Sequence, residues 1–251
     1  MTAEAKTYNS LFILGVRVDG VTFDQAVAFM EEFINEGRPH QVVTVNPEFV
    51  MVAQRDAEFR SIINHAALAL PDGVGVWWAS RRLGCPVPDR IPGVDLVDRL
   101  ASLSAQRGYR LFLLGAMPGV AERAARALCD RYPPLVIAGT YGGSPRPAEE
   151  DAIVAGIRAS RPHILLVAYG APAQDRWISR HLERLEVPVC IGVGGSFDYL
   201  AGVRLRAPGW LRRAGLEWLH RLMTQPWRWR RMLALPRFAW QVVWDRHHGP
   251  G

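Results

Sequence analysis

Cysteine is scarce in this chain, which has only Cys85, Cys129 and Cys190 among its 251 residues. An odd number of widely spaced cysteines predicts neither a disulfide framework nor a zinc site, and it suits a reducing cytosol. The seven histidines also lack metal-site spacing. The nearest acidic motif, Asp56-Ala57-Glu58, lies at a predicted helix start. We therefore expect no required metal ion and no cofactor.

Long apolar runs and nucleotide fingerprints are missing as well. No run approaches the roughly 18 apolar residues that span a bilayer, and the N-terminal residues do not resemble a signal peptide. We therefore expect a soluble or membrane-peripheral protein. Neither G-x-G-x-x-G nor G-x-x-x-x-G-K-[ST] occurs in the sequence, which disfavours a nicotinamide-dependent oxidoreductase and an NTPase.

Positive charge and tryptophan are concentrated at the C-terminal end. From Arg204 onward there are ten arginines and only two acidic residues, Glu217 and Asp245, together with six of the nine tryptophans. The composition changes near residues 200–206. We therefore expect an α/β core over residues 1–200 and a helical appendage over residues 201–251.

Apolar runs alternate with amphipathic segments through the core. The predicted strands are 11–18, 41–45, 66–70, 109–114, 135–139, 163–169 and 187–193. The predicted helices are 23–35, 47–55, 56–64, 74–83, 94–107, 120–131, 148–160 and 175–185. Continuous apolar strands that alternate with helices indicate an α/β fold, with a Rossmann-like, mostly parallel sheet and helices on both faces.

Polar side chains follow two of these strands. Thr44 and Asn46 stand at the end of one, and Asp72 follows another in Pro71-Asp72-Gly73. Open α/β sheets bind ligands at the carboxyl ends of their strands, so the three side chains are expected to meet at one rim. The structural alternative is that Asp72 is a turn residue and that Asn46 only opens a helix.

Other strand ends carry glycine-containing turns. The turn from Gly115 to Gly119 is the best candidate for a phosphate or nucleotide loop, although it could be only a tight turn. Arg90, in a Pro/Gly loop, suits a phosphate or carboxylate but could simply be solvated. The remaining expected substrate-binding residues are Gln174, Tyr141, Gly195 and Asp198, where Gln174 could also be just a helix start and Gly195 just part of a strand cap.

The appendage is expected to divide into short helices at Pro226 and Pro236. In the first of them, one stripe would be formed by Trp210, Ala214, Trp218 and Leu222, with Arg213 and His220 away from it. Tryptophan at headgroup depth and arginine toward anionic lipid are typical of interfacial helices. Core packing explains the tryptophans but not the arginines. Nucleic acid would explain the arginines, but no binding motif accompanies them, so we expect no nucleic-acid partner.

Seven motifs occur in the order of a known family. They are Thr44-Val45-Asn46-Pro47-Glu48, Pro71-Asp72-Gly73-Val74-Gly75, Arg90 with Gly93-Val94-Asp95, Gly170-Ala171-Pro172-Ala173-Gln174-Asp175, Gly192-Val193-Gly194-Gly195-Ser196-Phe197-Asp198, Arg206-Ala207-Pro208 and Gly215-Leu216-Glu217-Trp218-Leu219-His220-Arg221-Leu222. The chain resembles the WecG/TagA/CpsF glycosyltransferases (the GT-E fold, glycosyltransferase family 26) over about residues 10–240. Asp175 stands where the family more often has Glu, and His220 where Tyr is common.

The resemblance implies inverting, metal-independent transfer of a hexose from a UDP-sugar to a sugar on undecaprenyl diphosphate. The family transfers N-acetylmannosamine or glucose-type sugars in cell-surface polysaccharide synthesis, at the cytoplasmic face of the membrane. Asp72 would be the general base, and Thr44 would be a second catalytic residue. Thr44 and Asn46 would line the sugar pocket, which Arg90 and Gln174 would complete.

The resemblance also gives the appendage a role. Its arginines at positions matching Arg221, Arg228 and Arg231 would close over the site and meet the diphosphate. Independently of the resemblance, the tryptophans and arginines of the appendage predict an anionic membrane surface as a partner. A homo-oligomer is a further expected assembly. The alternative is a non-catalytic, membrane-peripheral protein that binds nucleotide sugars.

Overall fold

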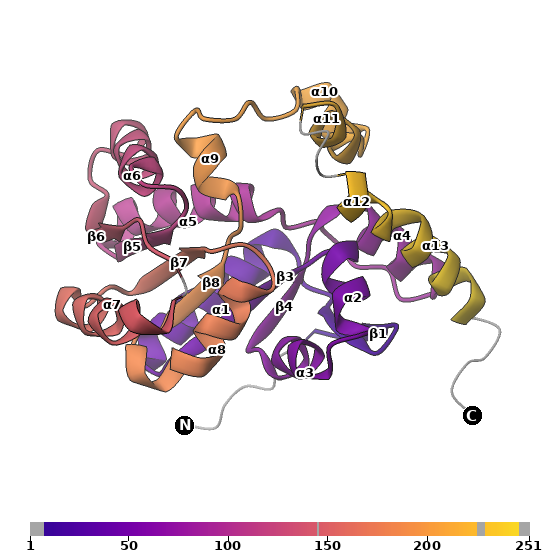
Figure 1. The fold of residues 1–251 in the computed structure, drawn as a ribbon, viewed down its shortest axis with the longest axis horizontal. Helices are drawn as coiled ribbons and strands as arrows, with labels where there is room; N and C mark the ends of the chain where they lie inside the picture. Colours follow the sequence, from indigo (N-terminus) through magenta and orange to yellow (C-terminus); the bar gives the residue numbers. More distant parts are fainter. Residues whose placement is uncertain (1–7, 145, 225–228, 246–251) are drawn as a thin grey trace.

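The computed structural model describes residues 8–144, 146–224 and 229–245. Its centre is a six-stranded parallel sheet in the order β4-β3-β8-β7-β5-β6 (Figure 1). The strands are β3 (His40–Val45), β4 (Leu68–Pro71), β5 (Arg110–Gly115), β6 (Val136–Tyr141), β7 (Ile164–Ala168) and β8 (Val189–Gly192). The predicted Rossmann-like α/β fold is confirmed.

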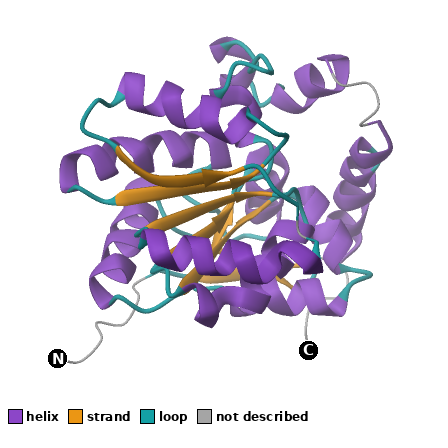
Figure 2. Cartoon of the chain, turned by 60° about the vertical axis from the view of Figure 1, so that its left-hand side comes forward, coloured by secondary structure: helices purple, strands orange, loops and turns teal. Residues whose placement is uncertain are grey.

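Helices cover both faces of this sheet, as Figure 2 shows. The core helices are α1 (Phe23–Glu36), α2 (Pro47–Ala53), α3 (Ala57–His65), α4 (Gly73–Arg82), α5 (Gly93–Arg107), α6 (Val120–Arg131), α7 (Pro147–Ser160), α8 (Ala173–Leu185) and α9 (Ser196–Leu200). Along β3, Val42 packs into the cluster on the α1, α5 and α6 face, whereas Val43 packs into the cluster on the opposite face. Both faces are therefore apolar, and this is why the strands read as continuous hydrophobic runs.

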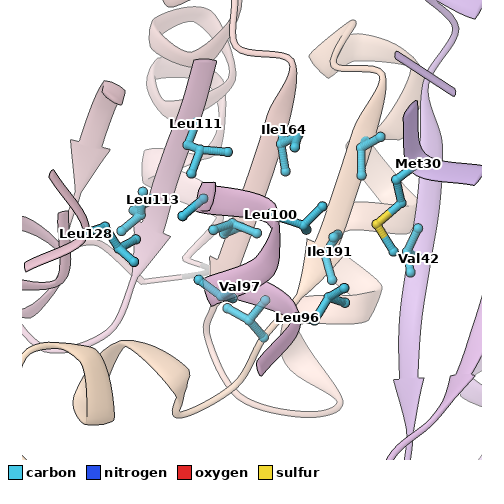
Figure 3. Packing of buried hydrophobic residues seen from close by; sticks show 14 of the residues in the cluster. Met30, Val42, Leu96, Val97, Leu100, Leu111, Leu113, Leu128, Ile164 and Ile191 are labelled. Atoms are coloured by element: carbon cyan, nitrogen blue, oxygen red, sulfur yellow. The ribbon is translucent and has the colours of Figure 1, made fainter. Parts of the chain in front are cut away.

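The larger core cluster lies between the sheet and α1, α5 and α6. Leu100 of α5 lies over Leu111 of β5 and Ile164 of β7, all fully buried, while Met30 of α1 reaches Val42 (Figure 3). Burial of a side chain of this size stabilises the fold by roughly 1.5–3 kcal/mol. This packing fixes the sheet, and with it the positions of the strand ends.

The N-terminal segment differs from the prediction of one strand over 11–18. It forms a hairpin of β1 (Ser10–Ile13) and β2 (Val16–Asp19), outside the main sheet. Leu14 and Gly15 both have positive φ, which gives the two-residue turn that joins tightly twisted strands. The unbroken apolar pattern concealed this turn, because leucine rarely occupies that conformation.

Asp19 connects the hairpin to the edge strand β4 by hydrogen bonding. Its buried carboxylate accepts hydrogen bonds from the Ala69 backbone N–H at 2.8 Å and from the Ser10 hydroxyl at 2.7 Å, and it pairs with Arg17 at 3.1 Å. The hairpin thereby covers part of the sheet edge, which would otherwise expose unpaired backbone groups.

Most predicted helix boundaries agree with the structure to within two residues. Thr22 caps α1 in a capping box with Gln25. The predicted strand over 135–139 is present as β6, which continues two residues further, to Tyr141. One short core helix was missed, because Ser196–Leu200 forms α9.

The C-terminal segment forms α10 (Gly209–Arg213), α11 (Glu217–Thr224), α12 (Trp229–Met232) and α13 (Ala234–Asp245). The expected single stripe from Trp210 to Leu222 is wrong, because the chain turns at Gly215, whose φ is +73°, and divides into two helices. The expected break at Pro236 is also wrong. Proline is tolerated there because it lies in the first turn of α13, where its missing N–H has no helical partner. Pro226 lies outside the described residues.

Helix α13 packs against α2 and α4, with Phe238 and Val242 buried in the same cluster as Val43 (Figure 1). The appendage therefore contributes to the apolar core on this side of the sheet. The expected division of the chain at residue 200 stays a prediction.

Candidate active site

A cavity of about 730 Å³ lies where β3 and β4 end. Its walls come from the first turns of α2 and α4, from the loop that carries Arg90, and from the C-terminal segment. The lining residues are Asn46, Pro47, Glu48, Asp72, Gly73, Val74, Gly75, Trp78, Arg90, Pro92, Asp95, Arg206, Arg212, Gly215, Glu217, Trp218, Met232, Leu235, Pro236, Phe238 and Ala239. Its size lies within the range of small-molecule sites, roughly 300–1,000 Å³.

The sheet register places Asn46 and Asp72 side by side at this rim. Val45 of β3 pairs with Pro71 of β4, and each polar residue directly follows one member of the pair. The Asp72 backbone N–H donates to the Val45 carbonyl at 2.8 Å, which holds the two strand ends together. Both residues line the cavity.

These two neighbours begin helices in different ways. The Asn46 side-chain oxygen accepts from the Phe49 N–H at 3.1 Å and so caps α2, leaving its amide N–H groups for other partners. Asp72 occupies the corresponding position of α4, but its carboxylate does not cap that helix. The Asp72 residue therefore lines the cavity wall, and its carboxylate makes no capping hydrogen bond to α4.

The first turns of α2 and α4 are packed tightly against each other. A Cβ atom at Gly75 would lie 2.4 Å from the Cγ of Pro47, so only glycine fits this contact. The close packing brings the N-terminal ends of both helices to the same cavity. Backbone N–H groups and the positive ends of the helix dipoles favour a bound anion there.

Three arginines line the described cavity, and they differ in their partners. Arg206 forms two hydrogen bonds with the Asp95 carboxylate, at 2.5 and 2.7 Å. Arg90 and Arg212 form no ion pair with any residue in the described part of the chain, and the Nε of Arg212 is buried without a hydrogen-bond partner there. These two guanidinium groups are available for an anionic ligand.

The three appendage arginines implied by the family resemblance belong to the C-terminal segment. Arg221 belongs to α11 and Arg231 to α12, whose main chains are described, whereas Arg228 lies outside the described residues. The contribution of all three to diphosphate binding stays a prediction. Arg212, which the sequence reasoning missed, lines the cavity from the neighbouring helix α10. The sequence pattern predicts one longer helix through this segment, so the position of Arg212 at the cavity does not follow from it.

Thr44 and Gln174 are described but are not among the cavity-lining residues. Thr44 is a buried β3 residue, 6% exposed, two positions before Asn46. Gln174 is 2% exposed, and its side-chain oxygen accepts from the Gly194 N–H at 3.0 Å. Gln174 thus supports the turn after β8, and a direct substrate contact stays a prediction for both residues.

Gly115, Gly119 and Tyr141 form a separate group at the ends of β5 and β6. Gly115 and Gly119 have φ values of +97° and +78°, and the turn between them lies against Gly142, at which a Cβ atom would be 3.4 Å from Pro118. Tyr141 is 42% exposed beside this turn. The structure brings these three predicted residues together, but none lines the described cavity.

Gly195 and Asp198 lie at the start of α9, also outside the lining of that described cavity. The Asp198 carboxylate pairs with Arg204 at 3.2 Å, and its carbonyl accepts from the Arg204 N–H at 3.0 Å. Asp198 therefore holds the chain that leads toward α10. Its predicted role in substrate binding remains untested.

No group of three or more His, Cys, Asp or Glu side chains among the described residues is arranged to hold a metal ion. None of the described helices combines the length and the apolar composition that crossing a bilayer requires. Metal-independent transfer stays a prediction.

A comparison with known proteins identifies the family of this chain. The chain matches the model of the glycosyl transferase WecG/TagA/CpsF family over residues 11–250. The chain belongs to this family. As a WecG/TagA/CpsF member it is a glycosyltransferase, and the cavity at the ends of β3 and β4 is its candidate active site.

Curated relatives extend the similarity over nearly the whole chain. Proteins of Staphylococcus aureus strains NCTC 8325 / PS 47 and COL are each 34% identical over 246 residues, covering 97% of this chain and 96% of theirs. The protein of strain MRSA252 has the same identity and coverage. Each relative is named N-acetylglucosaminyldiphosphoundecaprenol N-acetyl-beta-D-mannosaminyltransferase.

Proposed function

We propose that this WecG/TagA/CpsF member transfers a hexose, of N-acetylmannosamine or glucose type, from a UDP-sugar to a sugar on undecaprenyl diphosphate. The curated relatives support a lipid-diphosphate acceptor, and their name favours N-acetylmannosamine as the donor sugar. The product would enter a cell-surface polysaccharide, and the transfer would invert the anomeric centre without a metal ion.

The observation that carries this proposal is the placement of Asp72. Its carboxylate lines the cavity beside Asn46 and does not cap α4. In the proposed reaction Asp72 accepts the proton of the acceptor hydroxyl while that oxygen attacks the anomeric carbon. The bond from the anomeric carbon to UDP breaks, and UDP leaves from the opposite face of the sugar.

The departing diphosphate needs positive partners. Arg90 and Arg212 reach the cavity from opposite parts of the chain, and the first turns of α2 and α4 add backbone N–H groups. Cations and aligned dipoles that face the leaving group lower the barrier by stabilising the charge that develops in the transition state. We assign both arginines to the diphosphate of UDP and Asn46 to a sugar hydroxyl.

We further propose that the protein works on the cytoplasmic face of the membrane as a peripheral protein. Its acceptor would be lipid-linked, and tryptophans of the appendage are exposed, including Trp210 at 62% and Trp229 at 52%. Such side chains suit the bilayer interface, where amphipathic rings are enriched.

A variant pair tests the proposed general base. Turnover is measured as UDP release in the presence of a lipid-diphosphate monosaccharide, and donor binding is measured separately by calorimetry. Asp72→Asn should lower turnover by roughly 100- to 10,000-fold and leave donor binding within about twofold, since removal of a general base has effects of this size. Glu48→Gln removes a second carboxylate of the same cavity and should retain most activity. If Glu48→Gln abolishes turnover while Asp72→Asn does not, the assignment is wrong.

A further inference from the structure

A second cavity, of about 420 Å³, lies on the other side of α13 from the candidate active site. It is enclosed by α2, α3, the Ala171-Pro172 turn and α13. We call it the side hollow and define it by Phe49, Val52, Arg55, Ala171, Ala234 and Arg237. Glu48 lines both cavities, which places the side hollow directly beside the candidate active site.

Helix α13 separates the two cavities. Each residue of an α-helix is rotated by about 100° from the one before it, so positions 234 and 237 share one side while 235 and 239 share another. Ala234 and Arg237 accordingly line the side hollow, whereas Leu235 and Ala239 line the candidate active site. Phe238, between the two sides, is buried against the core.

The side hollow has two cations without ion-pair partners. Arg55 and Arg237 are both exposed, and neither forms an ion pair with any residue among those the structure describes. The nearby Asp56 carboxylate is already engaged, because it accepts from the Phe59 N–H at 3.0 Å and from the Arg176 guanidinium. The positive charges at the rim are therefore left for an anion.

Most of the wall between these arginines is apolar, and Glu48 and Asp56 are the carboxylates that line it. Phe49 and Val52 of α2, Ala171 and Ala234 offer hydrocarbon surface to the space beside the guanidinium groups. A free inorganic anion would gain nothing from such walls, whereas a ligand that joins a phosphate to a hydrocarbon chain would use both parts of the site.

Exposed tryptophans on α13 lie next to the side hollow. Trp240 and Trp244 stack with their ring centroids 5.7 Å apart, and they are 67% and 58% exposed. Counting rotation along α13, both lie on the outward side that adjoins Arg237. Tryptophan rings that stand out from a helix in this way are suited to the headgroup layer of a bilayer.

We propose that the side hollow binds one anionic phospholipid molecule of the membrane. Its phosphate would lie between Arg55 and Arg237, and the first carbons of its acyl chain would lie over Val52 and Ala234. Trp240 and Trp244 would rest at headgroup depth. The proposal depends on the proposed membrane association but not on the sugar-transfer reaction, and it would orient the candidate active site toward the surface that carries the acceptor.

The charge arm of the test compares two double variants of the full chain. Arg55→Gln with Arg237→Gln removes the cations of the side hollow. Arg123→Gln with Arg126→Gln removes two exposed arginines of α6 that form no ion pair within the described residues, and it serves as the matched control. Partitioning is measured on vesicles of phosphatidylcholine alone and of equal amounts of phosphatidylcholine and phosphatidylglycerol.

On the anionic vesicles, the side-hollow variant should partition roughly 20- to 30-fold more weakly, about fivefold for each arginine, while the control stays within about twofold. On phosphatidylcholine alone the two variants should not differ. An equal loss in both variants on anionic vesicles would mean diffuse electrostatic attraction and would overturn the proposal.

The shape arm keeps the charges and fills the hollow. Val52→Phe changes a side chain that is 37% exposed, so this variant is expected to fold, and Ala234→Phe fills the hollow from α13. Both should abolish saturable binding of monomeric dihexanoylphosphatidylglycerol, followed by tryptophan fluorescence. Unchanged binding in both variants would overturn the proposal, and so would displacement of this short-chain lipid by an equal concentration of inorganic phosphate.

A transfer assay separates this site from the sugar chemistry. With a water-soluble acceptor analogue, Arg55→Gln with Arg237→Gln should retain wild-type turnover, whereas turnover on acceptor embedded in anionic vesicles should fall in proportion to binding. If the wild-type protein transfers no sugar at all, the proposed function fails, yet the vesicle measurements still decide the lipid site.

Discussion

Arg206 holds Asp95 through two parallel hydrogen bonds, at 2.5 and 2.7 Å. Asp95 lies in the first turn of α5, and Arg206 begins the segment that leads into α10. The pair is half-buried at the edge of the candidate active site, and Glu217 of α11 approaches the same guanidinium at 3.9 Å. One side chain thus connects the core with two parts of the appendage.

Arg206→Gln should therefore affect turnover more than stability. Because Asp95 is partly exposed and its charge can be solvated, we expect the free energy of unfolding to fall by only about 1 kcal/mol. The cavity wall formed by α10 and α11 would lose its anchor, and misplacement of a substrate-binding wall can lower turnover by tenfold or more. Urea denaturation and UDP release measure the two effects.

Arg131→Gln is the matched control for this prediction. It breaks the pair between Arg131 and Asp98, which joins α6 to α5 away from the candidate active site. Its stability cost should be similar and its turnover unchanged. Equal turnover for Arg206→Gln and wild type would show that the appendage keeps its position without this pair.

Asn46 and Asp72 should respond differently to alanine. Asn46 caps α2 through its side chain, so Asn46→Ala should lower the free energy of unfolding by about 1 kcal/mol. Asp72 makes no such cap, and Asp72→Ala should cost less stability while removing far more activity. Chemical denaturation and the transfer assay, run on both variants, check this contrast. A larger stability loss for Asp72→Ala than for Asn46→Ala would contradict it.

The rim at β3 and β4 could be predicted because it depends on local sequence. A buried strand that ends in Pro71-Asp72-Gly73 and another that ends before Asn46-Pro47 place their polar residues at known points of a parallel sheet. The expectation that these side chains meet assumed that the two strands are neighbours. The structure shows this pairing, but it does not follow from local sequence, because pairing depends on packing between residues distant in the chain.

The appendage was predicted less well, for physical reasons. Gly215 adopts a positive φ and packs against Val74, so a Cβ atom added at position 215 would lie 3.0 Å from the Val74 Cγ2. This tertiary contact overrides the helical pattern of the surrounding sequence. Arg212 lines the cavity from α10, the helix that precedes this turn. Composition alone predicts a basic segment, but it does not predict which of its arginines lines the cavity.

Arg90 and Arg212 should contribute jointly to binding of the nucleotide product. A hydrogen bond to a charged group contributes about 1.5–3 kcal/mol, so Arg90→Gln and Arg212→Gln should each weaken UDP binding by about 10- to 100-fold. Isothermal titration calorimetry with UDP measures this directly. Arg126→Gln is the charge control, because Arg126 is an exposed residue of α6 that forms no ion pair within the described part of the chain. UDP affinity that is unchanged in Arg212→Gln would remove Arg212 from the proposed site.

The free energy of unfolding should depend on pH through Asp175, and the sign of this dependence can be predicted. The residue is fully buried in the first turn of α8, and burial raises the pKa of its carboxyl from 3.8 to about 7. Between these two pH values the native state holds a proton that the unfolded chain has released. The contribution of Asp175 to the free energy of unfolding therefore decreases as pH rises from about 4 to about 7, and it levels off above that.

Asp175→Asn removes this titration, so the variant should be more stable than wild type above pH 7 and should show a flatter pH dependence below it. Urea denaturation across that range measures the slope. Asp151→Asn is the control, because hydrogen bonding to Arg184 lowers the pKa of Asp151 and its titration falls below this window. If Asp175→Asn keeps the wild-type slope, the buried carboxyl is already ionised in the native protein, and the turn after β8 must then accommodate a charge beside Gln174.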